Sequence, residues 1–523
     1  MFMYRIQRLP ALRSSLHTFS PFVLAAICAT ATADPVSWIA GDGAWETAGN
    51  WSTGELPSAD DFVDIPTTGI LSASAGDNTA REVLSLGMLA ILSGKLDVIG
   101  TIDTSGTVAL SGGGLIGAGR IEVGETGAFT LDDALSAADV VEGVFNRGVL
   151  AVRGGARLGA ESFDNFAQWQ VESAGTAAAN SMINHGAATL ALTGADSTLT
   201  VSGNLTNDGA VVVEQLGSLA TWSLDNFASV LVTNGGAYST ETVINDGRIE
   251  VVGAGATWTA SDVVTNHGEI DIGPQGSASI ATLDNEASAV ITAATVDTVV
   301  ATNHANASLA LVDGAALTVG ELALNAGTLH IDATSVLMSG SFQQTAGSTV
   351  IDGGTLGATF PDGVAFVGGA LRGSGTLDAN LFVGGNAVIA PGLIPGAIGH
   401  FDILGDLLLT GGELLLDLAS TAPGDFDRLA VSGDIFLGGT LRIALGGGIA
   451  LAVGDYFDVL TGDTVNGLFD AIFLPALGGN LVFQVINGDD YVRVAVAAVP
   501  LPAPLLLLFA GCGLLSLVRR RAV

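Results

Sequence analysis

One short phrase recurs through the middle of this chain: an asparagine followed two positions later by glycine or alanine, as in NRG, NFA, NHG and NDG. Successive asparagines lie 19 to 23 residues apart, except for one interval of 40 that spans two units, with the missing repeat at Asn303 or Asn306. The nine regular positions are Asn146, Asn165, Asn184, Asn207, Asn226, Asn245, Asn266, Asn285 and Asn325. A fixed period of about 20 residues indicates a solenoid with one coil per repeat.

The residues between the asparagines favour strands over helices. Alternating segments such as AVVVE and RIEVV follow many of the asparagines, and a Gly-Ser or Gly-Ala turn often separates them from a second strand. We therefore predict an all-β fold, a parallel β-solenoid (β-helix) whose stacked coils bury a continuous apolar column; its handedness stays open. Asparagine and glycine suit tight turns because both tolerate left-handed backbone, and stacked asparagines can hydrogen-bond to those above and below.

Charge excludes one class of partner. The formal net charge is −35. Six of the 17 basic residues are terminal arginines, which leaves 11 basic against 52 acidic residues in the body. Such a surface repels phosphate backbones, so we expect no nucleic-acid partner. Loose Ca²⁺ binding is the only cofactor role that this charge suggests. We favour the simpler interpretation, that the acidic residues serve only to keep the chain soluble. Because the body has no cysteine, disulfides and cysteine metal sites are excluded there.

The N-terminus has the three parts of a secretory signal peptide. Arginines at positions 5, 8 and 13 precede the apolar stretch FVLAAICA, and the small residues Ala31 and Ala33 precede Asp34. This order of charge, apolar run and A-x-A site predicts export through the Sec translocon and cleavage by signal peptidase after residue 33. The apolar run is too short to span a bilayer.

The C-terminus carries a second candidate targeting segment. The sequence VPLPA, which is Val499, Pro500, Leu501, Pro502 and Ala503, is followed by an apolar run and then by Arg519, Arg520 and Arg521. From physics alone, the run of about 14 apolar residues with trailing arginines permits a weak stop-transfer tail in the inner membrane.

Taken together, these three parts resemble the VPLPA form of the PEP-CTERM sorting signal. That resemblance implies recognition by an exosortase-like enzyme, cleavage near the proline motif after transient anchoring in the inner membrane, and delivery to the surface or extracellular matrix of a Gram-negative bacterium. Whether the mature terminus is free, lipid-linked or glycan-linked stays open.

The chain divides into five segments. Residues 1–33 form the signal peptide, 34–85 a tryptophan-rich N-terminal cap, 86–367 the solenoid repeats, 368–496 a C-terminal β-helical region, and 497–523 the sorting signal. In the cap, Trp38, Trp45 and Trp51 favour closure of the first coil over stacking on sugar rings. This stretch resembles the opening of autotransporter-like and other secreted β-helical proteins, and the segment after Gly368 resembles the C-terminal β-helix of autotransporter passengers.

No arrangement of residues predicts an active site. The one candidate basic cluster is Arg147, Arg153 and Arg157, which we expect to be exposed within one coil. Adjacent acids point to opposite faces of a strand and make poor acid–base pairs, so loops explain them better. These pairs are Asp60-Asp61, Asp132-Asp133 and Asp489-Asp490.

Two histidines share the NHG position, His185 and His267, but they lie four coils apart. At about 4.8 Å per coil, roughly 19 Å separates them, too far to share a metal ion. We therefore expect turn residues, and no catalytic, cofactor or metal site.

These observations favour a non-enzymatic, exported β-helical protein of the cell surface or extracellular matrix, with a role in adhesion or in a biofilm or exopolysaccharide matrix. One alternative is a polysaccharide-active β-helix enzyme with Trp169, Trp222 and Trp258 along a sugar groove; carboxylates and arginines converging on one face of adjacent coils would favour it. Another is a Ca²⁺-binding matrix protein.

Overall fold

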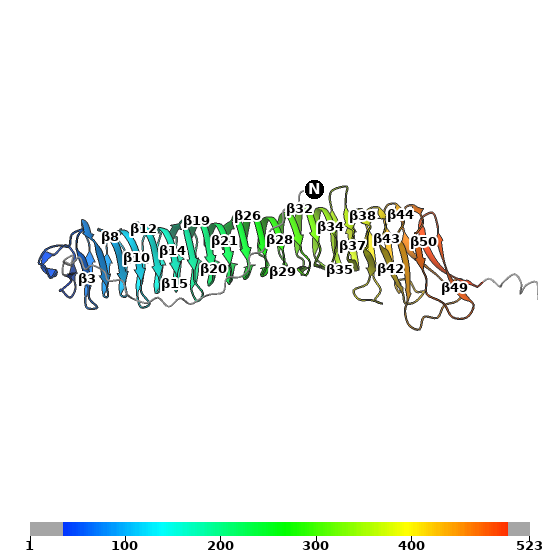
Figure 1. Ribbon diagram of the computed structural model, residues 1–523, viewed down its shortest axis with the longest axis horizontal. Helices are drawn as coiled ribbons and strands as arrows, with labels where there is room; N and C mark the ends of the chain where they lie inside the picture. Colours follow the sequence, from blue (N-terminus) through cyan, green and yellow to red (C-terminus); the bar gives the residue numbers. More distant parts are fainter. Residues whose placement is uncertain (1–34, 500–523) are drawn as a thin grey trace, which may run out of the picture.

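A computed structural model describes residues 35–499 of the chain. Strands make up 62% of it and helix 1%, and the strands form a parallel β-solenoid of about 16 coils of roughly 20 residues, so the predicted fold class is confirmed. Figure 1 shows a long rod in which the colour runs evenly from blue to red along the axis. Consecutive coils of residues 35–499 therefore lie side by side along the rod.

Each coil presents three faces, and every face is a stack of parallel strands. In the coil that begins with β19 (Thr198–Asn207), the strand bends between Val201 and Asn204, so residues 198–201 belong to the first face and 204–207 to the second. The short strand β20 (Ala210–Glu214) forms the third face. Each segment pairs in register with its equivalents in the coils before and after.

The same pattern repeats through the regular part of the rod. The bent strands are β8 (Lys95–Thr104), β10 (Leu115–Val123), β12 (Ala137–Asn146), β14 (Arg157–Asn165), β21 (Ser218–Asn226), β26 (Thr257–Asn266), β28 (Ser277–Asn285), β30 (Thr295–Asn303), β32 (Ala316–Asn325) and β34 (Val336–Gln344). In two coils the bend splits the strand into β16 (Thr176–Ala179) and β17 (Ser181–Asn184), and into β23 (Ala237–Thr240) and β24 (Thr242–Asn245). The third-face strands are β9 (Thr107–Leu110), β11 (Ala128–Leu131), β13 (Val149–Val152), β15 (Gln168–Glu172), β18 (Thr189–Thr193), β22 (Ser229–Thr233), β25 (Arg248–Val252), β27 (Glu269–Ile272), β29 (Ser288–Thr292), β31 (Ser308–Val312) and β33 (Thr328–Asp332).

Alternate residues of the strands in the regular coils fill the interior. In β20, Val211 and Val213 are fully buried while Ala210 and Val212 face outward. Because the side-chain period of a strand is two, each coil supplies a few valine, leucine or isoleucine side chains, and stacking joins them into one core cluster that runs the length of the rod.

The asparagines end the second-face strands, and their side chains point inward. The Nδ2 of each donates to the Oδ1 of the asparagine in the next coil at 2.7 or 2.8 Å, from Asn146 through to Asn325. The same Nδ2 also donates to a main-chain oxygen of the next coil, for example from Asn184 to Ala210 at 3.1 Å. Both hydrogens of each amide are thus used in the buried interior.

The structure also identifies the member that the spacing left undecided. Asn303 occupies the ladder between Asn285 and Asn325. Asn306 instead has a φ of 73° in the turn that follows. The ladder begins where Val123 pairs with Asn146, and it ends where Asn325 donates to the Oε1 of Gln344 at 3.0 Å.

The expected reason for asparagine and glycine at these turns is wrong. The ladder asparagines are extended strand residues with negative φ, not left-handed turn residues. The glycine two positions later also has negative φ at Gly209 and Gly247, and its smallness serves close approach instead. A Cβ on Gly247 would lie 2.1 Å from the carbonyl oxygen of Ala228 in the coil before.

A tryptophan-centred cap closes the first coils. Trp38, Trp45 and Trp51 are buried and meet edge to face, with ring centroids 5.1 and 4.8 Å apart. The indole of Trp51 donates to the main-chain oxygen of Trp45 at 2.8 Å. Buried rings cannot stack on a sugar, so these three serve the cap. Its elements and the first coils are β1 (Val36–Ser37), β2 (Gly43–Ala44), the 3-10 turn η1 (Ala48–Asn50), β3 (Phe62–Ile65), β4 (Ile70–Ala73), β5 (Asp77–Ala80), β6 (Glu82–Ser85) and β7 (Met88–Ile91).

Beyond Gln344 the three stacks continue in coils that grow longer. Second-face partners step from Leu381 to Leu407, then to Ile435 and Val465, which are intervals of 26, 28 and 30 residues. The added residues form loops outside the stacks. The strands are β35 (Ser348–Ala358), β36 (Val364–Phe366), β37 (Ala370–Asp378), β38 (Leu381–Val383), β39 (Val388–Pro391), β40 (His400–Ile403), β41 (Leu407–Leu409), β42 (Glu413–Leu418), β43 (Arg428–Val431), β44 (Ile435–Leu437), β45 (Thr440–Leu445), β46 (Tyr456–Thr461), β47 (Val465–Gly467) and β48 (Ala471–Phe473).

An antiparallel hairpin closes the far end. β49 (Leu481–Asn487) pairs with β50 (Tyr491–Ala498), and β50 also pairs antiparallel with β46. Val492 and Val494 of β50 are fully buried. The reversal of direction ends the parallel stack, as protected sheet ends require.

The ladder makes a stability prediction. Replacing Asn226 by alanine removes its bonds to Asn207, Asn245 and the oxygen of Arg248. One hydrogen of the Asn207 amide and the Oδ1 of Asn245 then have no partner in the buried interior. At about 1–3 kcal/mol for each unsatisfied buried group, we expect a loss of about 3 kcal/mol in the free energy of unfolding. Urea denaturation measures it. Asn180→Ala, at an exposed asparagine, should cost less than about 0.5 kcal/mol, and equal losses in the two variants would contradict the role of the ladder.

Candidate functional site

The residue after each ladder asparagine faces outward, and together these residues form a column along the rod, here called the flanking column. Since the asparagines pair coil to coil, the residues that follow them lie one above another. The column reads Arg147, Phe166, His185, Asp208, Phe227, Asp246, His267, Glu286, His304 and Ala326. The residue before each asparagine also faces outward, which places a second set of side chains next to this column.

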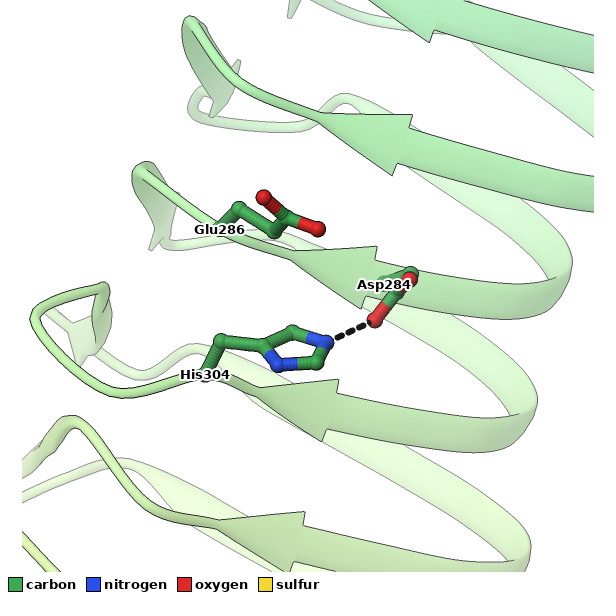
Figure 2. Close-up of side chains that lie close together, drawn as sticks. All are labelled: Asp284, Glu286 and His304. Atoms are coloured by element: carbon green, nitrogen blue, oxygen red, sulfur yellow. Dashed lines mark hydrogen bonds and ion pairs between the residues drawn. The ribbon is translucent and has the colours of Figure 1, made fainter. Parts of the chain in front are cut away.

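Asp284, Glu286 and His304 converge at one point of the flanking column (Figure 2). Asp284 and Glu286 lie on either side of Asn285, and His304 follows Asn303 in the next coil. One potential ligand atom from each residue lies within 4.8 Å of the others. The Nε2 of His304 contacts the Oδ1 of Asp284. All three side chains are partly exposed, so solvent ions can reach them.

His267 adds a second imidazole on the other side of Glu286. Its Nε2 lies 3.7 Å from the Oε2 of Glu286, and its Nδ1 lies 3.0 Å from the Oδ1 of Asp246 in the preceding coil. Four consecutive coils therefore alternate acid, imidazole, acid and imidazole along the column.

His185 sits in a related but poorer environment. Its Nε2 lies 3.3 Å from the Oδ1 of Asp164, which repeats the relation of His304 to Asp284. The position of Glu286 is taken there by Phe166, whose ring stacks on the imidazole at 3.8 Å. His185 and His267 thus belong to separate groups four coils apart, each with carboxylates of its own neighbourhood.

The three arginines of the expected cluster have separate surroundings, and Arg157 is exposed at the start of β14. Arg153 contacts Asp132 and also Glu172, with 3.5 Å from its Nη1 to the Oε1. The Arg147 guanidinium lies over the ring of Phe166 at 5.2 Å. The paired acid Asp133 closes a turn: burial alone would raise its pKa, but hydrogen bonds, chiefly from Leu135 and Ser136, hold the pKa below its usual value.

Arginine and carboxylates converge again on the third face, around Arg248. Arg248 lies 3.1 Å from Glu250, 3.7 Å from Glu269 and 3.0 Å from Asp271, across the neighbouring strands β25 and β27. One guanidinium thus neutralises part of a three-carboxylate group on a flat sheet surface. Carboxylates and an arginine that converge on one face of adjacent coils were expected to favour an enzyme. Here the three carboxylates form ion pairs with the one guanidinium.

The tryptophans proposed for a sugar groove do not line one. Trp169 and Trp258 are each 1% exposed and belong to the core, while Trp222 is 57% exposed at the bend between the first and second faces. An open cleft lies instead near the C-terminal end, where Arg428, Tyr456 and Asp458 are among the lining residues. Asp458 is held there by a bidentate pair with Arg493, at 2.6 and 2.9 Å.

Asp427 is the one carboxylate among the described residues that is fully buried. Its two oxygens accept hydrogen bonds from the main-chain nitrogens of Gly399 and Asp417, both at 2.8 Å. Asp427 thus joins the start of β43 to the loop before β40 and to strand β42. Burial raises the pKa of Asp427 to about 7, with a contribution from the charge of Asp417, although the two hydrogen bonds oppose the shift.

This buried acid makes stability depend on pH. The folded chain keeps a proton on Asp427 that the unfolded chain releases near pH 4, so its contribution is greatest below pH 4 and is lost as pH rises to about 7. We expect the free energy of unfolding to fall between pH 5 and pH 8, by at most about 3 kcal/mol from this group. Urea titrations at both pH values measure the fall. The variant Asp427→Asn should show a smaller fall, and an unchanged pH dependence would contradict the assignment.

The residues of the two terminal signals lie almost wholly outside the described part of the chain. Ala31, Ala33, Pro500 to Ala503 and the three terminal arginines are among them. Val499 is described, and its nitrogen donates to the oxygen of Asn480 at 2.7 Å, beside the closing hairpin. Between residues 35 and 499 there is no helix of the length and hydropathy needed to cross a membrane.

Comparison with known proteins adds no relative: no family model matches the chain, and no curated protein matches it significantly.

Proposed function

We propose that this chain is a non-enzymatic rod, exported through the Sec translocon and sorted by an exosortase-like enzyme to the cell surface or extracellular matrix. There it serves adhesion or the organisation of a biofilm or exopolysaccharide matrix. One observation carries this proposal: the chain leaves the solenoid at its closed C-terminal end, and Val499, the first residue of the VPLPA motif, follows directly from the closing hairpin.

That geometry suits a molecule held at one end. If the C-terminus is attached to a membrane or a matrix component, the tryptophan cap lies at the opposite end of the rod (Figure 1). About 16 coils, at about 4.8 Å each, place the cap roughly 80 Å from the attachment. A rod of this kind holds its distal coils clear of the surface that carries it.

The composition of the rod supports the same role. The interior is used for stacking, since the asparagine amides and apolar side chains pair coil to coil. The outer surface is strongly acidic and keeps a long repetitive chain soluble and apart from copies of itself. A rigid spacer outside the cell requires both properties.

Sorting is tested on the protein recovered from its native cell envelope and culture medium. We expect mass spectrometry to find no peptide beyond the Val499–Ala503 region in the mature protein. Replacing Pro500 and Pro502 by alanine, or the three terminal arginines by alanine, should leave the C-terminal peptide in place and retain the protein in the membrane fraction. Pro361→Ala, at an exposed proline of the body, is the control and should be processed normally.

An intact Arg519–Val523 terminus in every wild-type fraction would contradict the proposal. It would leave a membrane-tethered solenoid facing the periplasm.

A specific observation favours glycan contact as a second candidate function. The open cleft presents the half-exposed Tyr456, with Arg493 over its ring at 3.8 Å, between Arg428 and the acids Asp455 and Asp458. An aromatic ring among polar groups of both charges suits a polysaccharide rich in hydroxyl groups. Loss of polysaccharide binding in Tyr456→Ala, with no turnover by the wild type, would place this chain among matrix-binding proteins. Release of oligosaccharide products would favour the enzyme instead.

A further inference from the structure

The fold brings three potential metal ligands together without any dedicated loop. Asn285 pairs in register with Asn303, so Glu286 and His304, the residues that follow them, lie one coil apart in the flanking column. Asp284 lies on the other side of Asn285 and faces outward as Glu286 does. Because the asparagine ladder fixes both coils, these three side chains start from fixed backbone positions and only their own torsions have to adjust.

The distances suit a small ion. The three ligand atoms lie within 4.8 Å of one another. Ligand atoms around a tetrahedral zinc ion are about 3.4 Å apart, since each lies about 2.1 Å from the metal. Side chains that are 33% to 49% exposed can make that movement, which replaces the contact between His304 and Asp284 by two bonds to the ion.

The ligand types select the class of ion. An imidazole nitrogen with two carboxylates suits Zn²⁺ and the related transition metals, whereas Ca²⁺ takes six to eight oxygen ligands. We propose that Asp284, Glu286 and His304 bind one Zn²⁺-like ion on the side of the rod. Three protein ligands leave a fourth position for water or for a group from another molecule. This site goes beyond the proposed role as a rod and does not depend on it.

His267 acts as a positioning residue. It reaches Glu286 from the preceding coil, at 3.7 Å between Nε2 and Oε2, while Asp246 holds its other nitrogen at 3.0 Å. An imidazole held in this way keeps the carboxylate of Glu286 near the ion, as outer partners of metal ligands do.

The chain contains a natural comparison for this site. Asp164 and His185 repeat the relation between Asp284 and His304, but Phe166 stands where Glu286 would be. The two groups therefore differ by one carboxylate. They also show that the fold accepts a phenylalanine at this position of the column, so the variant Glu286→Phe removes a ligand without a foreseeable loss of structure.

The experiment is equilibrium binding of Zn²⁺ to the full chain, by competition with a chromophoric chelator and by calorimetry. We expect one saturable ion per wild-type chain. His304→Ala and Glu286→Phe should weaken that event at least about 100-fold, and His267→Ala by about tenfold. The matched control His185→Ala should bind as the wild type does. Thermal unfolding should show a rise in Tm with Zn²⁺ in the wild type and in His185→Ala, and no rise in the two ligand variants.

Two further readouts define the site. Co²⁺ should give visible absorption bands of the intensity typical of a tetrahedral site. These bands should be lost in His304→Ala, because loss of a protein ligand returns the ion to weakly absorbing, six-coordinate solvation. Ca²⁺ should not displace the one Zn²⁺ ion that binds saturably to each wild-type chain. Equal zinc affinity in His304→Ala and wild type, displacement by Ca²⁺ at comparable concentration, or no saturable equivalent in the wild type would each overturn the proposal, since each means diffuse binding to the acidic surface. Such a result would leave the sorting experiment unaffected.

Discussion

The hydrogen bond from one asparagine amide to the next is the interaction on which the regular part of this rod depends. A parallel stack has no hairpins to set its register, and a slip of one residue would turn every side chain to the opposite face. In this rod a slip of one residue would raise the free energy of the folded state in two ways. It would break a ladder of buried amides that satisfy one another, and it would move the residues beside the asparagines inward. At Asn285 those residues are Asp284 and Glu286, and burying either charge without a partner would be costly.

The same register explains why groups of interacting outer side chains on this fold form along columns of equivalent repeat positions. Side chains of one coil meet side chains of the coils directly above and below, at the same position of the repeat. A site therefore arises when neighbouring repeats differ at one position, as acid and imidazole do around Glu286, and it needs no loop or insertion. The longer C-terminal coils work differently, because the buried side chain of Asp427 bonds to the loop before β40 and to strand β42.

Much of the architecture could be predicted because the sequence repeats with a period of about 20 residues, one coil for each repeat. The spacing of the asparagines established coil length, strand direction and the amide ladder, and Asn303 failed to stand out only because Asn306 lies close to it. The role of glycine could not be derived from spacing: the distance from Gly247 to the Ala228 oxygen depends on how closely two coils approach. The Asp284, Glu286 and His304 group was missed because histidines were compared with each other at the NHG position. A comparison of each histidine with the acids one repeat away would have found it, and this signal was present in the sequence.

The alternation of acids and imidazoles in the flanking column has a second physical reading. In a strongly acidic stack, identical carboxylates at the same position would face each other about 4.8 Å apart, and each such pair would cost up to about 1 kcal/mol in water. Histidines between Asp246, Glu286 and the next coil relieve that repulsion whether or not a metal binds. Relief of repulsion accounts for His267, which lies between two acids of its own column. It does not account for Asp284, which comes from the other side of Asn285 and adds a second carboxylate to the one imidazole that it shares with Glu286. A carboxylate added where charge is already in excess raises the electrostatic cost of the folded chain, and a bound cation is what would offset that cost.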